Sequence, residues 1–238
     1  QEEPQSILGA NFVELCGDML TVKSEPVRIL PALNNAKKGS ELRKHSFFEA
    51  ASLRKFGDLY YFIYSSHVNH ELCYATSKYP DHGYKYRGVI VSNGDIGYHG
   101  RSAKDRLAAT GTNHGSIEYI NGKYYITCPA GGTGGWQICL RSDNIYGPYE
   151  HKLIMNDWSS YPKNGLHQGG MVQLKNGDWW FMIMQDRGPI GRVPCLVPVK
   201  WIDGWPMLGD KDGRIPNDTT LSYMSMEGIC GSDDFSAS

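Results

Sequence analysis

Apolar and polar positions follow one pattern at three places along the chain. The stretches "EAASLRKFGDLYYFIYSS", "HGSIEYINGKYYITCPAGG" and "GGMVQLKNGDWWFMIMQ" each carry a short apolar run, a glycine-containing turn and then two adjacent aromatic residues. Leu53, Ile117 and Val172 each stand seven residues before the first of these aromatics. Short apolar runs separated by turn residues are typical of strands, so the pattern predicts three β-hairpins.

The turns of these hairpins have recognisable residues. Asn121 and Gly122 form one Asn-Gly pair, and Asn176 and Gly177 form another. A tight two-residue hairpin turn needs positive φ angles, which Asn and Gly adopt readily, so both pairs predict such turns. The turn around Gly57 is a looser version of the same signal.

A second pattern follows the first two hairpins. "LCYATSKYPDHGYKYRGVIV" resembles "ICLRSDNIYGPYEHKLIM", and each reads as a strand, a polar corner with a glycine and another strand. One unit therefore holds about four strands over roughly 55–65 residues, which is typical of a β-propeller blade. We predict an all-β fold with a partial β-propeller over residues 1–209, made of about three blades and part of another. A sandwich of hairpins is the alternative, and the polar stretch 210–238 reads as a linker or tail.

Composition supports the all-β interpretation and argues against some partners. The 238 residues include 28 glycines, 15 tyrosines and 6 tryptophans, which suits glycine turns between aromatic strands. A net charge of −1 gives no electrostatic reason to expect nucleic acid or an anionic membrane as a partner. No apolar run reaches the roughly 18 residues that a membrane helix needs. The first residues, "QEEPQSILGA", lack a signal-peptide pattern. Because a signal peptide is removed from a mature protein, this does not decide the cellular compartment.

The cysteines do not form a metal-binding pattern. They lie far apart without a CxxC pair, so zinc-type spacing is absent. Free cysteine side chains tend to be buried, and we expect most of these to be buried free thiols. The six are Cys16, Cys73, Cys128, Cys139, Cys195 and Cys230.

Several of these stretches together resemble a known enzyme family. "FFEAASLRKFGDLYYFIYSS", "NHGSIEYINGKYYI", "LHQGGMVQLKNGDWWFM" and "LVPVKWIDGWPMLG" are similar to segments of glycoside hydrolase family 43, and the resemblance covers most of residues 11–209. It implies a five-bladed β-propeller that removes xylose or arabinose from plant polysaccharides with inversion, as a β-xylosidase or α-L-arabinofuranosidase. The expected partner is a xylo- or arabino-oligosaccharide. We expect an extracellular or periplasmic protein rather than a cytoplasmic one.

The resemblance also assigns roles to individual residues. Glu49 in "FFEAAS" matches the general acid of the family, and Arg187 in "QDRGP" matches an arginine that faces the sugar pocket. His167 in "LHQGG" matches a late histidine near the propeller axis, which in many members touches a metal ion or its waters. No cofactor is required, but a structural calcium held through water by His167 is one interpretation, because calcium prefers oxygen ligands. A hydrogen-bonded structural histidine is the other.

The chain departs from the family pattern in its order. "NFVELCGDMLTVKSEPVRILP" looks like the end of a blade, so the blades expected to carry the general base and a second Asp are absent, and a second polypeptide is one way to supply them. The end, "SDDFSAS", looks like the entry to an appended β-sandwich domain. Up to residue 113 the chain resembles one branch of the family and from "KYYITCPAGG" another, so His114 and His167 compete for one role. A fragment, a chimera and one half of a complex all fit this order.

Inverting hydrolysis places two requirements on the general acid. Inverting hydrolysis uses a protonated carboxyl group and an ionised carboxylate roughly 6.5–9.5 Å apart, with a water between them. The acid also needs a raised pKa, which Phe48 beside Glu49 favours by excluding water. A Glu at the start of a strand is otherwise an ordinary solvated charge.

The remaining candidates are less specific. Asp95, Asp157 and Asp186 are available as the general base, but each also suits a turn or loop. Trp158, in "NDWSSYPKNG", is the best candidate for a platform on which a sugar stacks. The alternative interpretation of Arg187 is an ordinary surface charge. Because only one of three expected carboxylates has support, a non-catalytic carbohydrate-binding or scaffold propeller is the alternative function.

Overall fold

The structure is a computed structural model that describes residues 10–31, 40, 48–66, 71–91, 116–130, 136–156 and 166–216. In this part, strands are joined by turns, and the one helical element is the 3-10 helix η3 (Gly188–Ile190). The strands are β1 (Ala10–Phe12), β2 (Val27–Leu30), β3 (Phe48–Phe56), β4 (Leu59–Ser66), β5 (Glu71–Ser77), β6 (Lys85–Val91), β7 (Ser116–Ile120), β8 (Lys123–Ala130), β9 (Trp136–Ser142), β10 (Glu150–Met155), β11 (Leu166–Gln173), β12 (Trp179–Asp186), β13 (Arg192–Ile202) and β14 (Trp205–Leu208).

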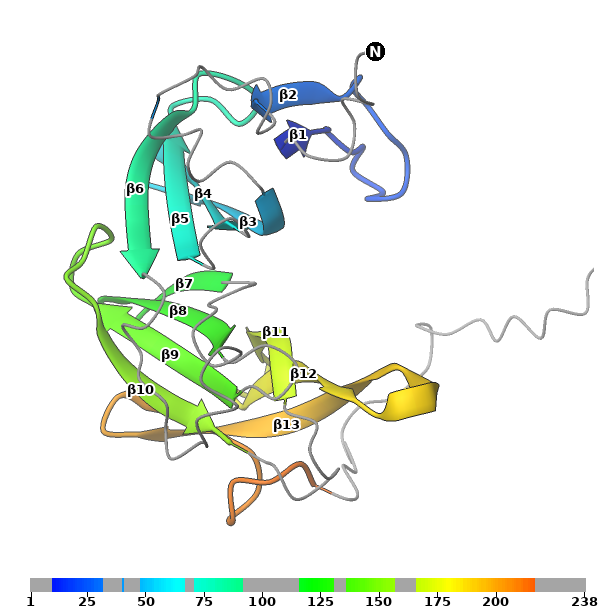
Figure 1. The fold of residues 1–238 in the computed structure, drawn as a ribbon, viewed down its shortest axis with the longest axis vertical. Coiled ribbons are helices and arrows are strands. Elements are labelled where there is room, and N and C mark those ends of the chain that lie inside the picture. The colour runs from blue at the N-terminus through cyan, green and yellow to red at the C-terminus, as the bar shows by residue number, and fades with distance from the viewer. Residues whose placement is uncertain are drawn as a thin grey trace, which may run out of the picture.

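The strands form three four-stranded antiparallel sheets and a two-stranded ribbon. Each sheet joins neighbours in chain order: β3 to β6 in the first sheet, β7 to β10 in the second and β11 to β14 in the third. The three sheets follow one another along an arc, with β3, β7 and β11 towards its inside and the β1–β2 ribbon at the opposite end from the third sheet (Figure 1). This radial order confirms the predicted all-β propeller class, with three blades and part of another.

The Asn-Gly pairs have different outcomes. Asn121 and Gly122 have φ angles of 49° and 84° and join β7 to β8 in a two-residue turn, which confirms that prediction. Asn176 and Gly177 do lie in the hairpin that joins β11 to β12, but the predicted two-residue turn is wrong, because β11 ends at Gln173 and β12 begins only at Trp179. The loop is closed by a hydrogen bond from the N–H of Leu174 to the carbonyl of Asp178, 2.8 Å, and within it only the glycine takes a positive φ.

The polar corners of the first two sheets repeat as the sequence predicts. In the first sheet, the hydroxyl of Tyr84 donates to the carbonyl of Pro80 at 2.9 Å. In the second, the hydroxyl of Tyr149 donates to the carbonyl of Ile145 at 2.7 Å. Each tyrosine thus closes its own corner across four residues, and the two corners are built alike.

Three apolar clusters hold the sheets together. We call the contact of the first and second sheets the first junction, and that of the second and third sheets the second junction. The first junction buries Tyr61, Ile63, Leu72, Val91, Ile117, Ile126, Cys128, Trp136, Ile138, Leu140 and Ile145. The second buries Tyr125, Cys139, Ile154, Met155, Leu166, Phe181, Ile183, Cys195, Val197, Val199, Trp205, Leu208 and Ile215. The third cluster packs the β1–β2 ribbon, through Ala10, Ile29 and Leu30, onto the opposite face of the first sheet.

The prediction that most cysteines are buried free thiols is confirmed for the cysteines in the described residues. Cys73, Cys128, Cys139 and Cys195 are free and buried, and Cys16 is free and half-buried. Cys230 and the rest of 217–238 lie outside the described residues. The division of the chain at residue 209 therefore stays a prediction.

Candidate functional site

Glu49, His167 and Arg187 lie at one end of the sheets, which we call the candidate end. It is the end at which β3, β7 and β11 begin and at which β4, β8 and β12 finish. Glu49 is the second residue of β3 and His167 is the second residue of β11. Arg187 directly follows β12. Residues far apart in the sequence therefore reach the same end of the fold because the strand order of the sheets repeats.

A β-bulge follows both Glu49 and His167. In the first sheet Glu49 pairs with Ser65, and the next regular pair begins only at Ser52. The intervening Ala50 has a φ of 52°. Bulges bend a strand and change the direction of its side chains, and they are frequent beside active sites. The small residues after Glu49 in "FFEAAS" were the available sequence signal for this irregularity.

The bulge of β11 is enforced by close packing. His167 pairs with Met184 and Gly169 with Ile183, so Gln168, with a φ of 65°, is the extra residue. A Cβ atom on Gly169 would lie 1.8 Å from the carbonyl oxygen of Met182, and the φ of this glycine is 141°. No other residue type fits there, which explains the glycine in "HQGG".

Several predicted residues lie outside what the structure describes. This applies to the side chains of Phe48, Glu49, His167 and Asp186 within their strands, and to Asp95, His114, Asp157 and Trp158 altogether. Their roles as acid, base, sugar contacts or metal-linked histidine stay predictions. The backbone nonetheless places Glu49, His167 and Asp186 at the candidate end.

Arg187 is a half-buried residue with defined contacts. Its Nε–H donates to Oε1 of Gln185 at 3.0 Å, and one terminal nitrogen lies 3.9 Å from Sγ of Cys195. Its backbone N–H donates to the carbonyl of Gly191 at 2.8 Å. This placement differs from that of a freely solvated charge, because both the main chain and the side chain are held.

Buried polar side chains at the candidate end were missed from the sequence. Ser65 and Ser66 at the end of β4, Gln137 near the start of β9 and Gln185 near the end of β12 all have an exposed fraction of 0%. A polar residue at a position where the period-2 pattern calls for an apolar one was the signal that could have found them. Gln185, for example, continues the buried row of Phe181 and Ile183.

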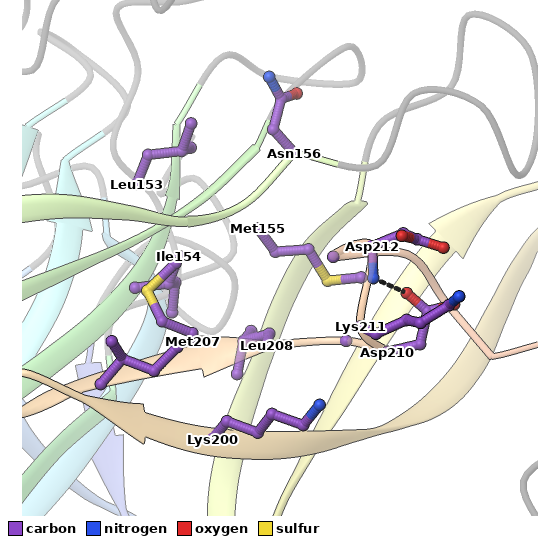
Figure 2. Close-up of a pocket in the computed structure, with 13 residues that line it drawn as sticks. Leu153, Ile154, Met155, Asn156, Lys200, Met207, Leu208, Asp210, Lys211 and Asp212 are labelled. Atoms are coloured by element: carbon purple, nitrogen blue, oxygen red, sulfur yellow. Dashed lines mark hydrogen bonds between the residues drawn. The ribbon is translucent and has the colours of Figure 1, made fainter.

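A separate hollow of about 500 Å³ lies where β10 approaches β13 and β14. Met155, Lys200 and Met207 line it, and the turn from Asp210 to Asp212 closes one side. Figure 2 shows Met155 extending toward this turn, whose Asp210 carboxylate accepts the backbone N–H of Asp212 at 2.8 Å. None of the predicted sugar-binding residues lines the hollow, so we do not assign it to the candidate site.

Metal-binding clusters and membrane-spanning helices were sought among the described residues. In those ranges, no three His, Cys, Asp or Glu side chains gather in a way that could hold a metal ion. The structural calcium stays a prediction, since His114 and the His167 side chain lie outside them. Over the same ranges, no helix has the length and hydropathy required to cross a membrane.

Comparison with known proteins gives a consistent family. Residues 99–206 match the model of Glycosyl hydrolases family 43. The chain is 55% identical over 119 residues to a xylosidase/arabinosidase of Thermoclostridium stercorarium, covering 50% of this chain and 25% of the relative. It is 42% identical over 85 residues to a β-xylosidase of Formosa agariphila, covering 32% of this chain and 14% of the relative. The chain thus spans a quarter or less of the length of these curated relatives.

Solved structures agree on the fold. The bifunctional GH43-CE protein of Bacteroides eggerthii superposes with a TM-score of 0.64 at 28% identity, over 89% of this chain and 24% of that one. The family 43 protein GH43B of the Bacteroides ovatus xyloglucan locus superposes with a TM-score of 0.55 at 20% identity, over 92% of this chain and 47% of that one. The second likeness shows the fold alone.

Proposed function

We infer that this chain, whose residues 99–206 belong to Glycosyl hydrolases family 43, is part of a glycosidase that acts on xylose- or arabinose-containing plant glycans. The observation that carries the proposal is the family match combined with the grouping of Glu49, His167 and Arg187 at one end of three repeated sheets. The names of the relatives, xylosidase, arabinosidase and β-xylosidase, support the substrate class.

In the proposed mechanism Glu49 is the general acid. Its protonated carboxyl group donates a proton to the glycosidic oxygen as the bond to the anomeric carbon breaks. A water molecule attacks that carbon from the opposite face while an ionised carboxylate accepts its proton, so the configuration inverts. Asp186, at the same end of the fold, is one candidate for this base, and Asp95 and Asp157 are the others. A further polypeptide segment is the remaining source.

Arg187 fits a binding role in this mechanism. Its Nε–H is used by Gln185, and a guanidinium group has further N–H donors that suit sugar hydroxyls or a carboxylate. The neutral oligosaccharide substrate agrees with the chain's net charge of −1, which neither attracts nor repels it.

The test is hydrolysis of xylobiose and arabinobiose by the purified chain and its Glu49→Gln variant, because a sugar leaving group, unlike p-nitrophenolate, depends on protonation by the acid. Loss of a general acid lowers kcat by about 10²–10⁴-fold, and this is the expected result. Glu118→Gln is the matched control, because Glu118 is a carboxylate of β7 that pairs with Arg54 at 2.7 Å. Its activity should match the unsubstituted chain.

Two outcomes would count against the proposal. Full hydrolytic activity retained in Glu49→Gln would remove the acid assignment. Sugar binding without hydrolysis, measured by calorimetry with xylobiose and arabinobiose, would favour the non-catalytic carbohydrate-binding or scaffold function instead.

A further inference from the structure

The second junction contains two fully buried amide side chains at the candidate end. Gln137 of β9 and Gln185 of β12 both have an exposed fraction of 0%. Within the described part of the chain, neither amide atom of Gln137 has a hydrogen-bond partner, and Nε2 of Gln185 has none. Buried polar atoms are normally paired, so each exception requires an explanation.

Both amides face the same apolar core. Side chains alternate along a strand, so Gln137 lies on the face of β9 that carries Cys139, a member of the second-junction cluster. Gln185 likewise lies on the face of β12 that carries Phe181 and Ile183, members of the same cluster. An apolar side chain of similar size would suit the packing of this junction better than an amide, because it leaves no polar atom unpaired.

The two glutamines differ in one contact. Oε1 of Gln185 accepts the Nε–H of Arg187 at 3.0 Å, whereas Gln137 contacts no residue of the candidate site through a described hydrogen bond. Gln185 and Arg187 are two residues apart, at the point where β12 ends and the chain turns into η3. The backbone of Arg187 is fixed by its bond to Gly191, and the direction of its side chain is set by the 3.0 Å bond to Gln185 together with the longer 3.9 Å contact with Cys195.

We propose that Gln185 is a positioning residue that holds the guanidinium group of Arg187 in the orientation needed to bind the sugar. This inference rests on the proposed function for its consequence in catalysis. One of the five N–H donors of Arg187 is used by Gln185 and one terminal nitrogen lies 3.9 Å from Sγ of Cys195, which leaves the other terminal N–H groups to contact substrate. A half-buried arginine held in this way loses little conformational freedom on binding, and even a 1 Å displacement of a binding group can lower the rate strongly.

The experiment compares Gln185→Met, Gln185→Glu and Gln137→Met in the complete chain. Methionine removes the acceptor at 185, whereas glutamate keeps an oxygen for Arg187. Gln137→Met removes an equally buried amide from the same junction without touching Arg187, so it is the matched control. We expect kcat/KM to fall about ten- to a hundredfold in Gln185→Met, and to be largely retained in Gln185→Glu and Gln137→Met.

Two further measurements separate positioning from a structural effect. In an Arg187→Met background, Gln185→Met should cause no further loss of kcat/KM, because both changes remove one coupled contact. The Nε–H resonance of Arg187, measured by nitrogen-15 NMR, should be protected from solvent exchange in the unsubstituted chain and in Gln137→Met. That protection should be lost in Gln185→Met.

The outcomes distinguish this inference from the proposed function. Equal losses of activity in Gln185→Met and Gln137→Met, or unchanged Nε–H protection in Gln185→Met, would overturn the positioning role while the glycosidase assignment stands. An unsubstituted chain that neither binds nor hydrolyses the sugars would overturn the proposed function. In that case the NMR comparison still decides whether Gln185 orients Arg187.

Discussion

The two junctions between sheets are built from different chemistry. The first is aromatic: the rings of Phe56 and Tyr61 lie 5.7 Å apart, those of Phe56 and Tyr124 lie 5.4 Å apart, and the hydroxyl of Tyr61 donates to that of Tyr146 at 3.2 Å. An ion pair between Arg54 and Glu118 joins its inner strands. The two tyrosine hydroxyls thus pair with each other, and the Arg54–Glu118 pair is partly exposed to solvent.

The second junction combines a core of both aliphatic and aromatic side chains, in which the rings of Tyr125 and Trp201 lie 5.3 Å apart, with one bridging arginine. Arg141 of β9 donates to the carbonyls of Asp203 and Gly204, each at 3.0 Å, and its guanidinium lies 4.1 Å from the ring centroid of Trp205. At the opposite end of the same junction lie the buried amides of Gln137 and Gln185. The comparison shows that similar sheets can be bridged by an exposed ion pair, as between Arg54 and Glu118, or by a mostly buried arginine, as at Arg141.

The largest expected effect comes from the bulge of β11, whose strand packs into the second junction. Gly169→Ala should destabilise the chain by about 3–5 kcal/mol, because the new Cβ would meet the Met182 carbonyl at 1.8 Å and the ring of Phe181 at 2.7 Å. Gly122→Ala is the control, since its φ is also positive but no atom lies within 4 Å. It should cost only about 1 kcal/mol. Urea unfolding of both variants checks this, and equal costs would contradict the close approach.

The next largest effect is a difference in stability cost between Arg141, which bridges the second junction, and Arg54, which bridges the first. Arg141→Met should lower the free energy of unfolding by about 2 kcal/mol, because three charge-assisted hydrogen bonds, to Asp203, Gly204 and Glu150, and a cation–π contact are lost. Arg54→Met should cost less than about 1 kcal/mol, as expected for an exposed ion pair. The exposed fractions of the two side chains, 15% for Arg141 and 51% for Arg54, explain the difference. Thermal unfolding of both variants measures it, and a larger cost for Arg54→Met would reverse the comparison.

The smallest effect is a change in thiol reactivity on the second sheet. Cys128 belongs to the first junction and Cys139 to the second. Burial raises the pKa of Cys128 from 9.0 to about 12, and burial together with the neighbouring Cys128 raises the pKa of Cys139 well above 9.0. Since the reactive form is the thiolate, both should resist iodoacetamide in the folded chain at pH 8.

Opening of one junction should then expose one thiol. In Arg141→Met, alkylation of Cys139 should become several-fold faster while that of Cys128 is unchanged, as read by mass spectrometry of labelled peptides. Equal acceleration at both sites would mean that the junctions open together. Because both folded pKa values exceed the unfolded value near 9.0, the stability that these thiols contribute should also decline as the pH rises above 9.

Much of the architecture could be predicted from local pattern. The repeated hairpins, the two polar corners and the turn at Asn121 and Gly122 depend on residues close together in the sequence, so their spacing carried the information. The loop at Asn176 and Gly177 could not be read this way, because the pairing of β11 with β12 ends earlier than the turn residues suggest. The same limit applies to the bulges after Glu49 and His167, which depend on pairing with a neighbouring strand.

The sequence by itself determined the strand order, the all-β class and the residues that resemble a family 43 acid, histidine and arginine, because period-2 alternation and short motifs are local properties. Only the tertiary structure decided that Gln185 holds Arg187 in a buried junction and that Arg141 bridges to Gly204, 63 residues away. Such contacts depend on which faces of the sheets pack together. That choice follows from the burial of whole apolar surfaces rather than from any one stretch of sequence.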